Sequence, residues 1–162
     1  MKNQHRVVLF TIESRRFALR LDCVERVIRA AEITSLPKAP DIVMGIINIH
    51  GEVVPVVNIR RRFSLPERNI SVNDQIIIIT TPRRKFCFFA DSVSGYAEIS
   101  SEEVINEEKL WHGIELVEGV IRLEGELVLI SGLNEFFQIE EESGLNDALS
   151  AENLKDIFAF RR

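Results

Sequence analysis

Short segments rich in β-branched and aliphatic residues recur along most of the chain. In two of them, residues 7–12 and 17–21, one face is wholly apolar, as in a strand with one side buried. Polar, glycine and proline residues separate the segments by hairpin-length stretches. This pattern predicts an all-β protein with minor helix, built as an antiparallel barrel or sandwich. The predicted strands are residues 7–13, 16–21, 45–50, 53–59, 75–81, 85–90, 93–99, 114–123 and 127–131.

The isoleucine run at residues 76–79 differs from the other segments, because it is apolar at every position. A strand that is apolar on both faces is typical of one covered from both sides. We therefore expect this strand to be central and to mark the junction of two lobes.

A few segments favour helix. Residues 22–29 place apolar side chains on one side, with Asp22 as a possible N-cap, and residues 40–44 predict a helical turn that ends at Gly45. Further short helical pieces are predicted at residues 60–63 and 133–139.

The end of the chain changes in composition. Residues 140–144 indicate a linker, and a terminal helix is predicted over residues 151–160. That helix either packs on the barrel or binds a partner or a membrane surface. These features divide the chain into a domain of residues 1–142 and a tail of residues 143–162.

The composition is that of one globular domain, with 162 residues, 46% hydrophobic and 28% charged. Cys23 and Cys87 stand in apolar surroundings and are expected to be buried, reduced thiols, with a disulfide or a reactive thiol as the alternatives. No apolar run is long enough to span a membrane and no signal peptide is evident. We therefore expect a cytoplasmic protein without direct membrane insertion.

The charge is unevenly divided along the chain. Residues 1–70 hold 12 Lys/Arg and 7 Asp/Glu, a net charge of +5, whereas residues 71–162 hold 8 and 18, a net charge of −10. These are either ordinary solvated surfaces or a basic and an acidic face for different protein partners. Nucleic acid is not expected as a partner, because the basic residues are not interleaved with aromatic ones.

Candidate chemistry is sparse. His5, His50 and His112 are far apart, and none has a carboxylate or cysteine at metal-ligand spacing. No phosphate-binding loop, dinucleotide fingerprint or nucleophile elbow is present. We expect no catalytic residue, metal or cofactor, so a binding module is favoured over an enzyme. A small barrel enzyme or ligand-binding protein remains the alternative and would need a cavity with convergent polar groups.

Residues 36–60, LPKAPDIVMGIINIHGEVVPVVNIR, resemble the signature of CheW-like domains, LPxAPxxVxGVxNLRGxVxPVVDLR. Residues 10–28 resemble the family's opening FxLxxxxFALPLxxVxEVI, and residues 88–93 resemble its VDxV strand. The closing hairpin is matched by residues 119–121 and 127–130, so the resemblance covers residues 7–139.

The resemblance implies two small barrels of about five strands each, packed side by side around a shared core. It also implies a non-catalytic adaptor in bacterial chemotaxis signal transduction. The partners would be the regulatory domain of the histidine kinase CheA and the cytoplasmic tip of methyl-accepting chemoreceptors. A groove between the lobes is the usual receptor side, and the lobe edges contact the kinase. The protein would be recruited to membrane-associated receptor arrays.

The chain departs from the family pattern at several polar positions. His50 stands where the family has Arg, and Arg26 stands where it has Glu, so the acid and base that could pair in the family are both changed. Asn58 replaces an Asp, and Ser131 stands where the closing strand has an acid. These changes suggest an alternative function, a divergent CheW-like scaffold in a motility, pilus or gene-regulatory chemosensory pathway.

We predict a partner-binding surface around the changed positions. Three of its residues, Arg26, Arg29 and His50, are expected to be exposed and to contact the partner directly. Others serve the fold equally well by shaping turns and backbone hydrogen bonds. The full predicted set is Arg26, Arg29, Pro37, Gly45, Asn48, His50 and Val54.

Overall fold

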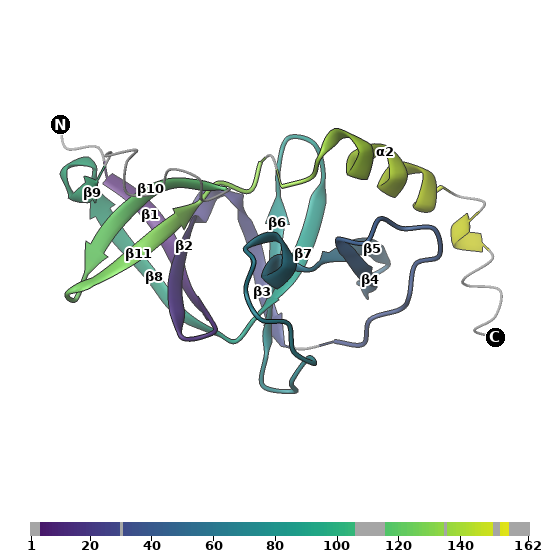
Figure 1. Cartoon of the computed structure of the whole chain (residues 1–162), viewed down its shortest axis with the longest axis horizontal. Helices are drawn as coiled ribbons and strands as arrows, with labels where there is room; N and C mark the ends of the chain where they lie inside the picture. The colour runs from purple at the N-terminus through teal and green to yellow at the C-terminus, as the bar shows by residue number, and fades with distance from the viewer. Residues whose placement is uncertain (1–3, 30, 106–115, 135, 151–152, 156–162) are drawn as a thin grey trace.

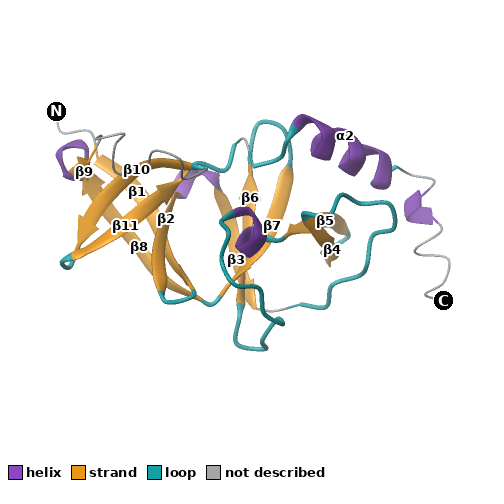
Figure 2. Cartoon of the chain, viewed as in Figure 1, coloured by secondary structure: helices purple, strands orange, loops and turns teal. Residues whose placement is uncertain are grey.

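The computed structural model describes residues 4–29, 31–105, 116–134, 136–150 and 153–155. Most of these residues lie in strands, so the predicted all-β class with minor helix is confirmed (Figure 2). The strands are β1 Gln4–Ile12, β2 Arg15–Arg20, β3 Val24–Arg29, β4 Val43–Ile49, β5 Glu52–Val57, β6 Gln75–Thr80, β7 Lys85–Ala90, β8 Ser92–Ser100, β9 Val104–Ile105, β10 Val117–Leu123 and β11 Glu126–Ser131. The helical pieces are η1 Leu21–Cys23, α1 Ile59–Arg62, η2 Ser101–Glu103 and α2 Ile139–Ala148.

The strands form two sheets that lie side by side along the long axis (Figure 1). The first lobe is a six-stranded sheet in the order β8-β1-β2-β11-β10-β9, and the second lobe is a five-stranded sheet in the order β3-β6-β7-β5-β4. In each lobe one pair of neighbouring strands is parallel, β2 with β11 and β5 with β7. Each lobe therefore combines segments that are far apart in the sequence.

Neither sheet closes into a barrel, so the expectation of two closed barrels is corrected. In the second lobe the edge strand β4 meets the chain that follows β3 only at the isolated bridge between Thr34 and Ile46. In the first lobe the outer strands β8 and β9 follow each other in the chain through the short turn η2. The edge strand β9 holds only two residues, Val104–Ile105, which is too short to complete a ladder along β8.

The two lobes share a central apolar core, and each has a smaller core of its own. Phe10 of β1 and Phe88 of β7 meet in the central core, with their ring centroids 5.3 Å apart. On β6, Ile77 and Ile79 face this core, whereas Ile76 and Ile78 face the core of the second lobe. All four side chains of the isoleucine run are buried, which confirms the prediction of a central strand covered on both sides.

The prediction of a helix over residues 22–29 is wrong. Only the single turn η1 forms there, and β3 follows it as an antiparallel partner of β6. The β-branched residues Val24, Val27 and Ile28 pair with the isoleucine strand, where such side chains pack well. The spacing of apolar residues in this segment is compatible with a helix as well as with a strand. Pairing with β6 selects the strand.

The C-terminal elements also differ from the prediction. Residues 133, 134 and 136–138 form no helix, and Phe136 and Phe137 instead pack on Phe86 with centroids 5.4 Å away in each case. The predicted linker at residues 140–144 is the first half of α2, which a capping box between Gln138 and Glu141 begins. Most of the helix predicted over residues 151–160 lies outside the described residues, and residues 153–155 are helical.

The other predicted turns are largely correct. Residues 60–63 correspond to α1, whose N-cap Asn58 accepts a hydrogen bond from the Arg61 backbone at 3.0 Å. The segment before Gly45 turns only briefly, with the Val43 backbone donating to the Pro40 carbonyl at 2.9 Å, and β4 begins at Val43. Residues 92–95 open β8, as expected of a strand start.

Both cysteines are free, as predicted, although only Cys87 is fully buried. Burial raises the pKa of Cys87 to about 12. Burial, together with the neighbouring Asp22, raises the pKa of the half-buried Cys23 to about 11.

We expect both thiols to resist alkylation in the folded protein, because the thiolate is the reacting species. At about pH 8 a thiol with the pKa of Cys23 is roughly 0.1% ionised, against roughly a quarter for an ordinary cysteine. Intact-mass spectrometry after iodoacetamide treatment should show an unmodified folded protein and two adducts on the urea-unfolded one. Prompt modification of the folded protein would contradict this expectation.

Candidate functional site

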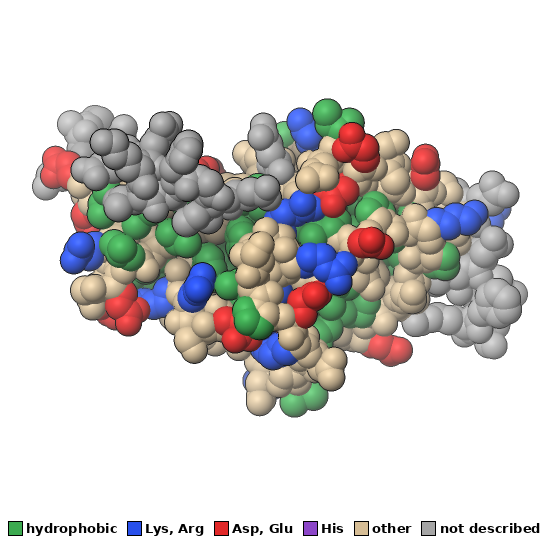
Figure 3. Space-filling model, viewed as in Figure 1, with side chains coloured by type: hydrophobic (Ala, Val, Ile, Leu, Met, Phe, Trp, Pro, Cys, Tyr) green, Lys and Arg blue, Asp and Glu red, His purple; other side chains and the backbone are tan. Residues whose placement is uncertain are grey.

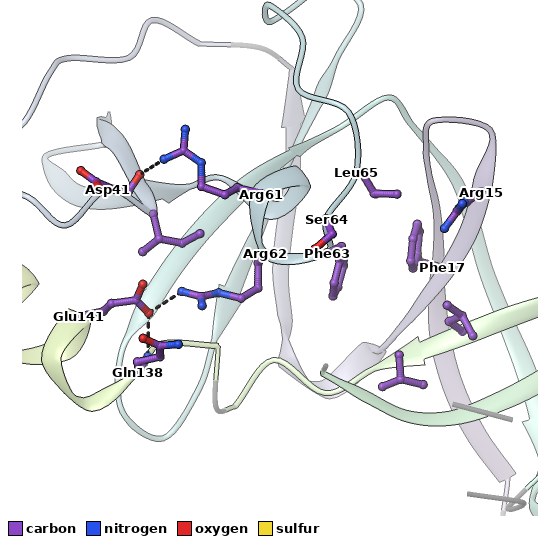
Figure 4. Close-up of a pocket in the computed structure, with 13 residues that line it drawn as sticks. Arg15, Phe17, Asp41, Arg61, Arg62, Phe63, Ser64, Leu65, Gln138 and Glu141 are labelled. Carbon is purple, nitrogen blue, oxygen red and sulfur yellow. Dashed lines mark hydrogen bonds and ion pairs between the residues drawn. The ribbon is translucent and has the colours of Figure 1, made fainter. Parts of the chain in front are cut away.

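A groove of about 670 Å³ lies between the two lobes (Figure 4). Strands β2, β10 and β11 of the first lobe form one wall. Helix α1 with the residues after it, and the start of α2, form the other. Its position at the junction means that its shape depends on how the lobes are held together.

The floor of this groove is apolar and aromatic. Phe17 of β2 stacks on Phe63 at the end of α1, with ring centroids 5.3 Å apart and planes inclined by 7°. Leu129 and Val117 extend the apolar surface on the first lobe, and Leu65 does so on the second. An apolar floor shared by two lobes suits a partner side chain or an apolar helix face.

Charged groups surround the floor. Arg61 donates to the Asp41 carbonyl at 3.0 Å, and Arg62 forms an ion pair with Glu141 of α2. The Arg62 guanidinium also lies over the Phe136 ring, 5.1 Å from its centroid. Its Nε is buried and has no hydrogen-bond partner among the described residues. The groove therefore offers an apolar centre with a rim of both charges.

An ionic cluster joins the two lobes, with Arg60 and Asp74 buried and its other members partly or fully exposed. Arg60 of the second lobe forms ion pairs with Glu13 of the first lobe and, at 2.5 Å, with Asp91 at the crossing between them. Arg68 binds the same Asp91 at 2.6 Å and also Asp74 at 2.7 Å. We call these five residues the interlobe clamp.

The clamp lowers the pKa of both of its aspartates. Burial alone raises the pKa of Asp74, but hydrogen bonds from Arg68 and the Ser71 backbone lower it below its ordinary value. Asp91 behaves in the same way, since the backbone N–H of Glu13 and the Arg60 guanidinium outweigh burial and lower its pKa.

These lowered pKa values predict acid destabilisation. A carboxylate with a lowered folded pKa contributes stability above its unfolded pKa of about 3.9, and that contribution is lost as pH falls through the folded pKa. Urea midpoints should therefore fall as pH drops below about 5. Asp74→Asn should be less stable than the wild type at neutral pH, and the difference should shrink towards pH 3. A difference that is independent of pH would contradict the assignment.

The structure brings together three of the sequence-predicted partner residues. Arg26, His50 and Val54 line a small pocket of about 140 Å³ at one end of the second lobe. Arg26 and His50 are exposed, and neither has a hydrogen-bond or ion-pair partner within the part of the chain that the structure describes. Val54 is buried beneath them. We call this group the hairpin pocket, after the β4–β5 hairpin that carries His50.

Lys85 supplies the ion pair of the hairpin pocket. Its Nζ lies 2.8 Å from Glu25 and 3.0 Å from Glu52, and these two contacts raise the pKa of its ammonium group. Thus β7 contributes a cation that neutralises the acids of β3 and β5. The sequence did not indicate this role, because the three residues are distant along the chain and no motif connects them.

The remaining predicted residues lie outside both cavities. Gly45 is buried in a β-bulge of β4, and Asn48 accepts a hydrogen bond from the Gly51 backbone at 2.8 Å within the hairpin turn. Pro37 is exposed, and its carbonyl accepts from Asn153 at 3.2 Å. Arg29 is exposed at the end of β3. For Gly45 and Asn48 the structure provides a direct role in the fold.

Charges of both signs intermingle on the second lobe in the view of Figure 3. Many are already joined in ion pairs, including Arg84 of the β6–β7 hairpin with Glu142 of α2, 2.9 Å apart. The uneven charge along the sequence therefore does not produce two separate charged faces in this view.

The sequence analysis did not predict Arg62 and Phe63 as residues of a binding site. The arginine run at residues 60–62 is the sequence feature that could have indicated them.

The described residues contain no group of three His, Cys, Asp or Glu side chains placed to hold a metal ion. Within the same residues, no helix has both the length and the apolar character to cross a membrane.

Comparison with known proteins identifies one family. The model of the CheW-like domain matches residues 6–141. The chain is 23% identical over 144 residues to chemotaxis protein CheW of Treponema pallidum, covering 85% of each chain. It is 31% identical over 102 residues to chemotaxis protein CheW of Thermotoga maritima, covering 60% of this chain and 64% of that protein.

A solved structure has the same fold. The scaffolding protein TtCheW of Thermoanaerobacter tengcongensis superposes with a TM-score of 0.76 at 24% sequence identity, covering 86% of this chain and 91% of the other. The two-lobed arrangement is therefore shared with a protein whose sequence is mostly different.

Proposed function

The chain belongs to the CheW-like domain family, and from this we propose that it is a non-catalytic adaptor that couples a CheA-type histidine kinase to chemoreceptors. In this role it joins the kinase's regulatory domain and the cytoplasmic receptor tip. It acts in the cytoplasm at membrane-associated receptor arrays and does not itself enter the bilayer. Its relatives among the chemotaxis proteins support the adaptor role.

The groove between the lobes is the observation that carries this proposal. An α-helix with an apolar stripe can lay that stripe on Phe17, Phe63 and Leu129, while its polar residues meet the charged rim. The receptor tip is the partner that we assign to this groove. A groove shared by two clamped lobes offers such a partner a preformed surface, which reduces the entropy cost of binding.

The hairpin pocket is the surface that we assign to the kinase. It lies at an edge of the second lobe, with Arg26 and His50 exposed at its rim. Exposed charges of this kind contribute mainly to specificity and to the association rate.

Separate variants test the two surfaces. Arg15→Glu, in the groove wall, should weaken binding of a receptor fragment about tenfold and leave binding of the kinase's regulatory domain unchanged. Arg26→Glu should do the reverse. Arg122→Glu, an exposed arginine of β10 that lines neither cavity, is the matched control and should change neither affinity. Biolayer interferometry with both fragments measures each affinity.

The proposal fails if the wild-type protein binds neither fragment. If both fragments bind and no variant discriminates between them, the adaptor role stands, but the two surfaces are assigned wrongly.

The second candidate function is a divergent scaffold in a motility, pilus or gene-regulatory pathway. Arg26 and His50 favour this function. Arg26 replaces the family's acid and His50 replaces its arginine, so the acid–base pair of the family is lost here. Comparing affinities for each chemosensory kinase encoded in the same genome distinguishes the two functions. Preference for a kinase outside the chemotaxis cluster would support the scaffold.

A further inference from the structure

A second kind of site lies on the first lobe and shares no lining residue with the groove or the hairpin pocket. There, one end of the six-stranded sheet opens into a pocket of about 250 Å³. Every strand of the sheet and the turn η2 contribute a residue to its lining. We call it the mouth pocket.

The inner wall of the mouth pocket is aliphatic. Val7 and Ile99 are almost fully buried, and Ile130 and Val104 complete the wall. These side chains belong to the core of the first lobe, so the pocket is an open end of that core. Its volume lies just below the roughly 300 Å³ at which pockets begin to hold drug-sized ligands, which restricts the occupant to a small molecule.

The rim carries one positive and one negative group side by side. Arg20 Nε donates to Glu118 Oε1 at 2.5 Å, and this contact raises the pKa of the arginine. No hydrogen bond of the terminal nitrogens of Arg20 is found within the described residues, and the side chain is 54% exposed. His5 and Ser101, whose Nε2 and Oγ are 3.2 Å apart, complete the polar rim.

The local backbone is shaped around Glu118. A β-bulge between Val117 and Gly119 leaves Glu118 without a partner in β11 and turns its side chain towards Arg20. Gly132 makes room for that carboxylate, because a Cβ there would stand 2.9 Å from Glu118 Oε2. A Cβ at Gly119 would come within 3.3 Å of Val104 in the aliphatic wall. Both glycines therefore keep the mouth open.

We propose that the mouth pocket binds an aliphatic α-amino acid. The ligand's carboxylate binds the terminal nitrogens of Arg20, its ammonium group binds Glu118, and its side chain occupies the aliphatic wall. A rim with both charges complements a zwitterion better than an ion of one sign, because each ligand charge meets its opposite. An adjoining hollow shares His5 and Arg20 with the mouth pocket and extends to Asp22.

Methyl-resolved NMR of the full chain tests this inference with four probes. L-leucine carries a carboxylate, an ammonium group and an aliphatic side chain. Glycine lacks the side chain, isovalerate lacks the ammonium group and isoamylamine lacks the carboxylate. Leucine should shift the methyl signals of Val7, Ile99, Val104 and Ile130 saturably. The other three probes should bind at least tenfold more weakly, since each leaves one element of the pocket unmatched.

Glu118→Gln should weaken leucine at least tenfold while leaving the weak isovalerate affinity unchanged. Glu126→Gln, an exposed acid of the same lobe that does not line the pocket, is the matched control. Because Gly132→Ala displaces Glu118 without changing any charge, it should also weaken leucine, and unchanged methyl spectra in the absence of ligand show that each variant folds.

Equal affinity for all four probes, no saturable binding of leucine, or shifts confined to other methyl groups would each overturn the inference. The adaptor proposal is independent of this result, because the partner affinities are measured without any amino acid.

Discussion

Replacing Arg60 by methionine is expected to lower the free energy of unfolding by about 2 kcal/mol. The Arg60 side chain is 10% exposed and donates to Glu13, Asp91 and the Pro66 carbonyl, so it is the centre of the interlobe clamp. Methionine fills much of the same volume but leaves Glu13 without its cation and Asp91 with Arg68 alone. Removing one partner costs more than the pair contributes, because the carboxylates left behind, 36% and 28% exposed, are partly desolvated.

Arg61→Met is the matched control for this prediction. Arg61 is the next residue of α1, and its ion pair with Glu67 is about half exposed on both sides, at 49% and 53%. Exposed pairs contribute about 0–1 kcal/mol, so this variant should remain close to the wild type. Urea unfolding at neutral pH measures both. Equal losses for the two variants would show that the clamp does not hold the lobes.

Replacing Gly45 by alanine is the second substitution with a large expected effect, a loss of about 3 kcal/mol. A Cβ at this position would stand 2.4 Å from the Thr34 carbonyl oxygen and 2.6 Å from Ile33 Cγ2. The oxygen is backbone and belongs to the bridge that joins β4 to the chain after β3. Relief of the clash therefore requires the bridge to open.

Gly51→Ala separates this clash from backbone strain. Gly51 lies in the β4–β5 turn with φ +87°, but a Cβ there would meet no atom within 4 Å. The cost should be about 1 kcal/mol, from the left-handed conformation alone. Urea unfolding of the two variants measures the difference, and a Gly51 variant as unstable as the Gly45 variant would contradict the steric account.

Strand positions were predictable because half-buried strands alternate and their turns carry glycine and polar residues. The isoleucine run at residues 76–79 even indicated its central place, since only a strand covered on both sides tolerates four apolar residues in succession. Residues 22–29 misled because their apolar spacing fits a helix, and the partner strand that makes them β3 is about 50 residues away. Whether such a segment becomes helix or strand depends on pairing with a distant segment, and local periodicity carries no information about that pairing.

The candidate site was predictable in part. Arg26, His50 and Val54 were expected to lie on one surface, and they line one pocket. Lys85 was not expected there, because its contacts with Glu25 and Glu52 depend on three strands meeting. Closure of the barrels was inferred from the family resemblance, and the short strand β9 and the single bridge at Thr34 leave both sheets open.

Formation of a ternary complex tests the central claim most directly. A kinase regulatory domain and a receptor fragment are mixed with and without this protein, and co-sedimentation of the kinase domain with the assembled receptor fragment is measured. Our account predicts that the kinase domain sediments only when the protein is present, and in proportion to it. A kinase domain that stays in the supernatant with saturating protein, or that sediments equally without it, would contradict the adaptor function.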